Sequence, residues 1–75
     1  MKITMQEFEA FEKQFVFEVL KNPDYRIGQA FINDYRDISH SMMADGDNGV
    51  LNNNRLWNSK DRDEVLKLID WYLIK

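Results

Sequence analysis

The residues with the most obvious chemical potential form the run DGDNG at positions 45–49. Its spaced oxygen donors resemble part of an EF-hand, whose calcium loop needs donors at the first, third and fifth positions, glycine at the sixth and a carboxylate at the twelfth. No register of this chain satisfies that pattern, and a loop that starts at Asp45 ends on Leu56. We therefore interpret the run as a turn and expect no calcium site there.

The single histidine, His40, lies between Ser39 and Ser41 and is the second candidate for chemistry. A Ser–His nucleophile needs the two groups to converge in space and a third residue to orient the imidazole. Neighbours on a helix instead point about 100° apart, and a histidine in the last helical turn is explained by the helix dipole. Since the chain has no cysteine either, we expect a protein that is not an enzyme and has no catalytic residues, metal ligands or cofactor.

Ten Lys and Arg residues against 13 Asp and Glu residues give the 75-residue chain a net charge of −3. That balance is too acidic for a general nucleic-acid binder and too even for a protein that mimics DNA. No apolar run is long enough to span a membrane, and the N-terminal sequence does not resemble a secretion signal. Together with 44% hydrophobic residues, these features favour one globular domain in the cytoplasm, without a membrane partner.

The first element that positions these residues is a helix predicted over residues 5–21. Thr4 and Glu7 form a capping box, in which each side chain accepts a hydrogen bond from the backbone N–H of the other residue. The apolar residues of this helix recur three and four positions apart, at Phe8, Phe11, Phe15 and Val19. Pro23 pushes the residue before it out of the α region and so predicts the end of the helix.

A second helix is predicted over about residues 24–42, because apolar residues continue at helical spacing through this segment. They are Ile27, Phe31, Tyr35, Ile38 and Met42. Gly28 lies inside this helix at a cost of ~1 kcal/mol relative to alanine. We expect a glycine at such a position where another backbone packs close.

Residues 44–58 are rich in glycine and asparagine and predict a long, mobile loop that ends where Leu56 and Trp57 pack onto the core. A third helix is predicted over about residues 59–74, with Ser59 or the residue before it as N-cap. The expected fold is therefore all-α: a small single domain of three helices, with a long loop between the second and the third.

Three polar residues of the second helix share one face: Arg26, Gln29 and Asn33 lie within about 60° of one another, with Arg36 at the flank. In one interpretation they are scaffold, and the two amides bond to the backbone of the 44–58 loop. In the other, they form a polar contact face for a partner. A DNA-reading helix is disfavoured, because aspartates lie close to both arginines and weaken the attraction to phosphate.

The sequence RIGQAFIN at residues 26–33, placed after an amphipathic helix and before a tryptophan and an acidic-capped helix, resembles small accessory proteins of tailed bacteriophages. The resemblance extends over about residues 15–74. It implies a viral product that acts in the bacterial cytoplasm and blocks a host protein, such as a component of an anti-phage defence system of the restriction, BREX-like or CRISPR kind. A DNA-associated regulator and a virion assembly cofactor are the alternatives.

Apart from Ala10 and Leu20, which lie on the same side of the first helix as Phe17, five apolar residues fall outside the predicted core-facing stripes: Phe17, Ile32, Met43, Trp71 and Ile74. Each helix of a three-helix unit needs a wide apolar sector, so these residues can all belong to one core. Alternatively, large apolar side chains gathered on a surface mark an interface. Because a chain of this size buries only ~60% of its unfolded surface, the second interpretation predicts a protein interface at these residues and a homodimer.

Overall fold

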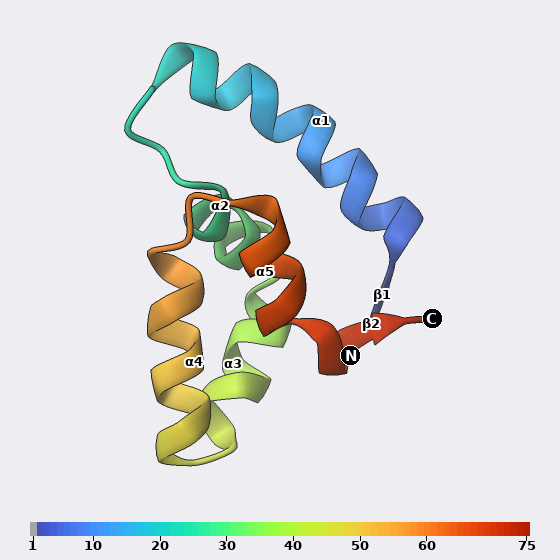
Figure 1. Ribbon diagram of the computed structural model, residues 1–75, viewed down its shortest axis with the longest axis vertical. Coiled ribbons are helices and arrows are strands. Elements are labelled where there is room, and N and C mark those ends of the chain that lie inside the picture. Colours follow the sequence, from blue (N-terminus) through green and yellow to red (C-terminus); the bar gives the residue numbers. More distant parts are fainter. Residues whose placement is uncertain (1) are drawn as a thin grey trace.

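The computed structural model describes residues 2–75 and contains five α-helices within that range. In chain order the elements are β1 (Ile3–Thr4), α1 (Met5–Lys21), α2 (Ile27–Asp34), α3 (Arg36–Ala44), α4 (Asp47–Trp57), α5 (Arg62–Leu68), the 3-10 turn η1 (Asp70–Tyr72) and β2 (Leu73–Ile74) (Figure 1). The prediction of a mostly helical fold is confirmed, whereas the prediction of three helices is wrong.

Helix α1 has the predicted bounds of 5–21. The Glu7 backbone N–H donates to Thr4 Oγ1 at 3.0 Å, and the Thr4 N–H donates to Glu7 Oε1 at 3.0 Å. The bond from Glu7 satisfies one of the backbone N–H groups that a helix N-terminus otherwise leaves unpaired. At the other end, Asn22 leaves the helical conformation directly before Pro23, as predicted.

The segment predicted as one helix, residues 24–42, forms two helices, because the helical conformation is interrupted at Tyr35. The first of them, α2, begins only at Ile27. Tyr35 has φ −125° and ψ 58°, outside the helical region. Its ring stacks on Phe31 at 4.8 Å between centroids and meets Phe11 edge-on at 6.3 Å. Because Tyr35 is held by this packing at the junction, α3 takes a new direction and still brings its own apolar residues to the core.

Helix α4 occupies most of the segment predicted as a loop, residues 44–58. Its buried and half-buried residues lie four and three positions apart: Gly49, Asn53 and Leu56. Gly49 lets α3 come so close that a Cβ at this position would lie 1.8 Å from the Met42 carbonyl oxygen. Asn53 Oδ1 accepts a hydrogen bond from Ser39 Oγ at 2.7 Å. Contacts with α3 therefore stabilise a helix that its asparagine-rich sequence disfavours.

The helix predicted over residues 59–74 is also shorter than expected. Helix α5 covers only residues 62–68, with Asp61 as its N-cap, and the chain then passes through η1 into β2. Strand β2 pairs in parallel with β1, and the register places Leu73 opposite Ile3. The two ends of the chain therefore meet on one side of the molecule (Figure 1).

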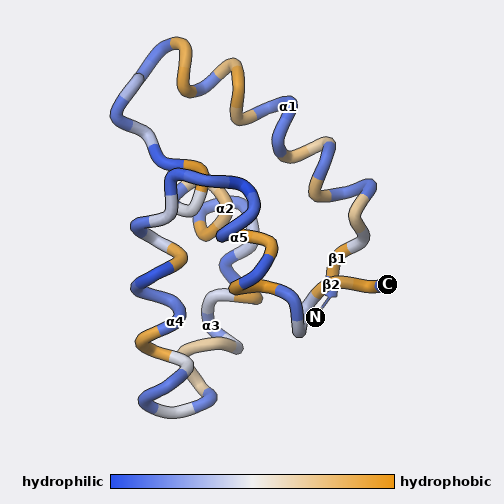
Figure 2. Tube along the Cα trace, viewed as in Figure 1, coloured by the Kyte–Doolittle hydropathy of each residue, from blue (hydrophilic) through white to orange (hydrophobic). Residues whose placement is uncertain are grey.

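The core is centred on aromatic side chains where α1 crosses the other helices. Phe8, Phe11 and Phe31 lie 5.4 to 6.0 Å apart between ring centroids. Leu56 is fully buried beside them, as predicted, whereas Trp57 remains 38% exposed. The buried residues of α1 all lie in its N-terminal half, yet hydrophobic residues continue along the whole helix (Figure 2).

Candidate interaction surface

The five residues predicted as an interface do not lie together. Ile32 is only 9% exposed and belongs to the core, because α2 packs against four other helices. The other four are exposed: Phe17 by 63%, Met43 by 41%, Trp71 by 77% and Ile74 by 51%. They lie on α1, α3, η1 and β2, and Phe17 is in the half of α1 that is farther from the paired chain ends (Figure 1). Ile32 is therefore withdrawn from the predicted interface, whereas the other four residues remain exposed on four different elements.

Three of the exposed large hydrophobic residues lie close together in the C-terminal half of α1. Val16 is 53% exposed, Phe17 63% and Leu20 74%, and we call these three residues the α1 apolar face. Leu20 lies beside both of the others, because residues three and four apart are neighbours on a helix. Val16 lies about 80° from Phe8 around the helix, at the edge of the buried stripe, which is why the hydrophobic pattern did not single it out.

Behind this face lies a hollow of about 350 Å³, which we call the α1 hollow. Phe15 and Val19 line it from α1, Tyr25 lines it from the connector between α1 and α2 (residues 22–26), and Ile27 lines it from the start of α2. The Phe15 and Tyr25 rings lie 5.9 Å apart between centroids. Charged residues complete the lining: Asp24, Arg26 and Lys60. The hollow therefore combines an apolar floor with charged groups that come from two separate parts of the chain.

Two residues of the predicted polar face, Gln29 and Asn33, make hydrogen bonds that stabilise the start of α2 and the segment before it. Gln29 Oε1 accepts a hydrogen bond from the Arg26 backbone N–H at 3.3 Å and so caps α2. Asn33 Nδ2 donates to the Tyr25 hydroxyl at 3.0 Å and ties the connector to α2. Arg36 lies on α3, beyond the break at Tyr35, and is exposed. The two amides thus bond near their own helix, and neither of these bonds joins the 44–58 segment, although the scaffold interpretation had suggested such bonds.

Gly28 has the role that its place in the sequence predicted. A Cβ at this position would lie 1.6 Å from the Leu56 carbonyl oxygen, because the end of α4 crosses the start of α2. The Gly28 N–H donates to the Ser59 carbonyl at 3.0 Å and closes the same crossing. This crossing places Lys60, the residue after Ser59, at the edge of the α1 hollow.

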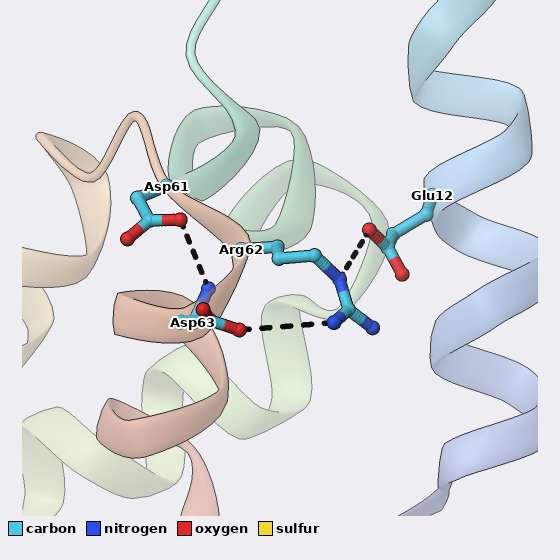
Figure 3. A network of polar contacts seen from close by, with 4 residues as sticks. All are labelled: Glu12, Asp61, Arg62 and Asp63. Atoms are coloured by element: carbon cyan, nitrogen blue, oxygen red, sulfur yellow. Dashed lines mark hydrogen bonds and ion pairs between the residues drawn. The ribbon is translucent and has the colours of Figure 1, made fainter.

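An ion pair connects the middle of α1 to α5 on the inner side of the helix. The Arg62 side chain reaches from α5 to Glu12 on α1 (Figure 3), with 2.7 Å between Arg62 Nε and Glu12 Oε2. The hydrogen bond with Glu12 raises the pKa of the Arg62 guanidinium. The Asp61 carboxylate accepts from the Asp63 N–H at 3.3 Å and caps α5 at this point. The spacing between α1 and α5 is therefore held one turn before the hollow begins.

The residues considered for chemistry lie apart from the α1 hollow. Within residues 2–75 no group of three His, Cys, Asp or Glu side chains is placed to hold a metal ion, and His40 is exposed. Burial raises the pKa of the Tyr72 phenol, and the nearby Asp45 carboxylate raises it further. Neither residue lines the α1 hollow. Across the same range, no helix combines the length and the apolar character that crossing a membrane requires.

Comparison of the chain with models of protein families, with characterised proteins and with solved structures finds no match in any of the three.

Proposed function

We propose that this chain is a non-enzymatic interaction protein that binds and inhibits a bacterial host protein through the α1 apolar face. The observation that carries the proposal is the exposure of Val16, Phe17 and Leu20, which are 53%, 63% and 74% exposed within two turns of one helix. Single exposed apolar residues are ordinary on protein surfaces. Contiguous groups of large ones are characteristic of interaction sites.

The energetics favour a partner that covers more than these three side chains. Burying one large apolar side chain completely contributes about 1.5–3 kcal/mol. Scaled by the exposed fractions, the whole face contributes roughly 3–6 kcal/mol. Association itself costs several kilocalories per mole, so a partner that binds tightly must also use the neighbouring surface.

The kind of target is proposed from the resemblance of residues 26–33 to accessory proteins of tailed bacteriophages. In this proposal the chain acts in the cytoplasm of an infected bacterium. Its target is a component of an anti-phage defence system, such as a restriction, BREX-like or CRISPR enzyme. Inhibition occurs by occlusion, because a bound chain covers a surface that the enzyme needs.

The proposal is tested by capture from bacterial lysate followed by mass spectrometry, with the wild type compared with the double variant Phe17→Glu/Leu20→Glu. Gln6→Glu is the control, because it adds a negative charge at an exposed position of the same helix about three turns from Phe17. We expect a host protein that the wild type and the control capture and the double variant does not. Capture that is equal for all three would contradict the use of this face.

Inhibition is tested separately by phage plating. Expression of the wild-type chain should restore plaque formation on cells that carry the captured defence system, and the double variant should not. Retention of the wild type on heparin at modest salt would instead favour a DNA-associated regulator. Co-purification with virions would favour an assembly cofactor.

A homodimer is the second part of the proposal. A twofold interface uses the same patch on both copies, so the α1 apolar face is sufficient to form one. With roughly 3–6 kcal/mol available per copy, such a dimer is weak and can be displaced by a larger target surface. Self-association should therefore depend on Phe17 and not on Trp71, which lies near the paired chain ends.

A further inference from the structure

We infer that the α1 hollow is the anchor site of this interaction. It receives one large apolar side chain of a partner segment, and a residue next to that side chain in the segment carries a carboxylate. The inference rests on the proposed function and specifies the chemistry of the partner. It does not depend on which host protein supplies the segment.

The size and lining of the hollow fit a single large side chain. Its volume of about 350 Å³ lies at the lower end of the range of ~300–1,000 Å³ that is typical of binding pockets. Phe15 and Tyr25 offer ring surfaces, and Val19 and Ile27 offer aliphatic surfaces. Interface anchors are most often aromatic side chains seated in pockets of this kind.

The hollow is held open by contacts around it, so a partner does not have to form it. The bond from Asn33 to the Tyr25 hydroxyl holds the connector on one side. The ion pair of Glu12 with Arg62 sets the distance between α1 and α5. Pro23 restricts the backbone where the connector leaves α1. A preformed site of this kind lowers the ordering cost of binding.

The charges at the edge of the hollow select an acidic partner. Arg26 approaches the hollow from the N-cap of α2 and Lys60 from the link between α4 and α5, and Asp24 is the carboxylate that lines the hollow with them. Neither cation makes an ion pair with another of the residues 2–75. The local charge is therefore +1 (two cations and one carboxylate) on a chain whose net charge is −3. A carboxylate is attracted to this point and repelled by the chain as a whole.

The hollow is also continuous with the α1 apolar face. Val19 lines the hollow, and the next residue, Leu20, belongs to the exposed face. Val16 lies one turn before both of them, and such residues are neighbours on a helix. A segment anchored in the hollow therefore extends over Val16 and Leu20, which supplies the additional contact that tight binding requires.

The test uses two blocked tetrapeptides, EWLE and KWLK, which share the apolar pair and differ only in the charge beside it. Each is titrated into the isotopically labelled full chain, and amide shifts are followed by NMR. We expect EWLE to shift the amides of residues 24–27 and Lys60. Because exposed charge pairs are individually weak, we expect EWLE to bind about three- to tenfold more tightly than KWLK.

Substitutions at the edge of the hollow complete the test. Lys60→Glu should remove most of the preference for EWLE, and Lys60→Gln should remove part of it. Lys67→Glu is the matched control, since Lys67 is an exposed lysine that does not line the hollow, and it should keep the preference. The spectrum of each free variant shows whether it remains folded.

Three results would overturn the inference. They are equal binding of the two peptides, shifts confined to other parts of the chain, and a preference that survives Lys60→Glu in a folded variant. Shifts at residues 24–27 that depend on protein concentration, without peptide, would assign the hollow to a second copy instead. If capture of a host protein still depends on the α1 apolar face in any of these cases, the proposed function stands and only the anchor site is wrong.

Discussion

Replacement of Gly28 by alanine is the most direct test of the packing that creates this surface. Helix propensity alone predicts that Gly28→Ala stabilises α2 by ~1 kcal/mol. The structure predicts the opposite sign, because the new Cβ would lie 1.6 Å from the Leu56 carbonyl oxygen and 2.8 Å from the Leu56 carbonyl carbon. Both atoms belong to the backbone, so no side-chain rotation relieves the overlap.

The cost follows from the shift that the backbone must make. A packed interior has few voids that could accommodate the new methyl group. Helices α2 and α4 must therefore separate by roughly 1.5–2 Å to restore an ordinary van der Waals contact. Separation also weakens the hydrogen bond from the Gly28 N–H to the Ser59 carbonyl and loosens the packing around Leu56. Overpacking in a core typically costs ~1–3 kcal/mol and occasionally more. With the upper value of ~3 kcal/mol for this overlap with backbone atoms and up to ~1 kcal/mol for the weakened hydrogen bond, less ~1 kcal/mol gained in helix propensity, the expected net loss is about 2–3 kcal/mol.

That loss is large for a chain of this size. At ~0.05–0.15 kcal/mol per residue, the total free energy of unfolding is roughly 4–11 kcal/mol. A change of 1 kcal/mol in the free energy of unfolding shifts the thermal unfolding midpoint, Tm, of a small domain by about 4–8 °C. Gly28→Ala should therefore lower Tm by roughly 10–20 °C.

Thermal unfolding followed by circular dichroism measures this shift, and urea unfolding gives the free energy. The control is Ala10→Gly, the reverse exchange at an exposed position of α1, which should cost only about 0.5–1 kcal/mol. A Gly28→Ala variant with an unchanged or higher Tm would refute the close crossing of α2 and α4.

Three further predictions concern the surface, the buried tyrosine and the fourth helix. Phe17→Glu should leave the free energy of unfolding within about 0.5 kcal/mol of the wild type and abolish self-association in sedimentation equilibrium. Trp71→Glu should leave self-association unchanged, and a wild type that is monomeric at about 100 µM contradicts the dimer. The pKa of Tyr72 is raised above its ordinary value of 10.0, so above that pH the unfolded chain loses a proton that the folded chain keeps. Stability should therefore fall as the pH rises beyond 10.0, and by less in Tyr72→Phe, as unfolding in urea across this range would show. In hydrogen exchange, the amides of residues 51–56 should be protected like those of a packed helix, and exchange at loop rates would contradict the assignment of α4.

The sequence alone determined those features of the fold that depend on interactions between residues close together in the chain. Helix α1 has both predicted ends because Thr4 and Glu7 bond to each other across one turn and Pro23 acts on the residue directly before it. Gly28 was likewise interpretable in advance, since a glycine in an apolar helix indicates the approach of another backbone. The sequence could not show which backbone, because Leu56 and Ser59 are about thirty residues away and their segment reads as a loop.

Tertiary contacts alone decided the rest. Helix α4 faces α3 with Gly49 and Asn53 rather than with a row of apolar residues, so its contact surface is invisible to a hydrophobic pattern. The pairing of β1 with β2 joins opposite ends of the chain, and no local signal encodes it. The same limit applies to the candidate surface, because a helical angle gives the direction of a side chain and not what covers it. Ile32 is buried since α2 is enclosed by four helices, whereas Phe17 is exposed since it lies on the side of α1 opposite Phe15 and Val19.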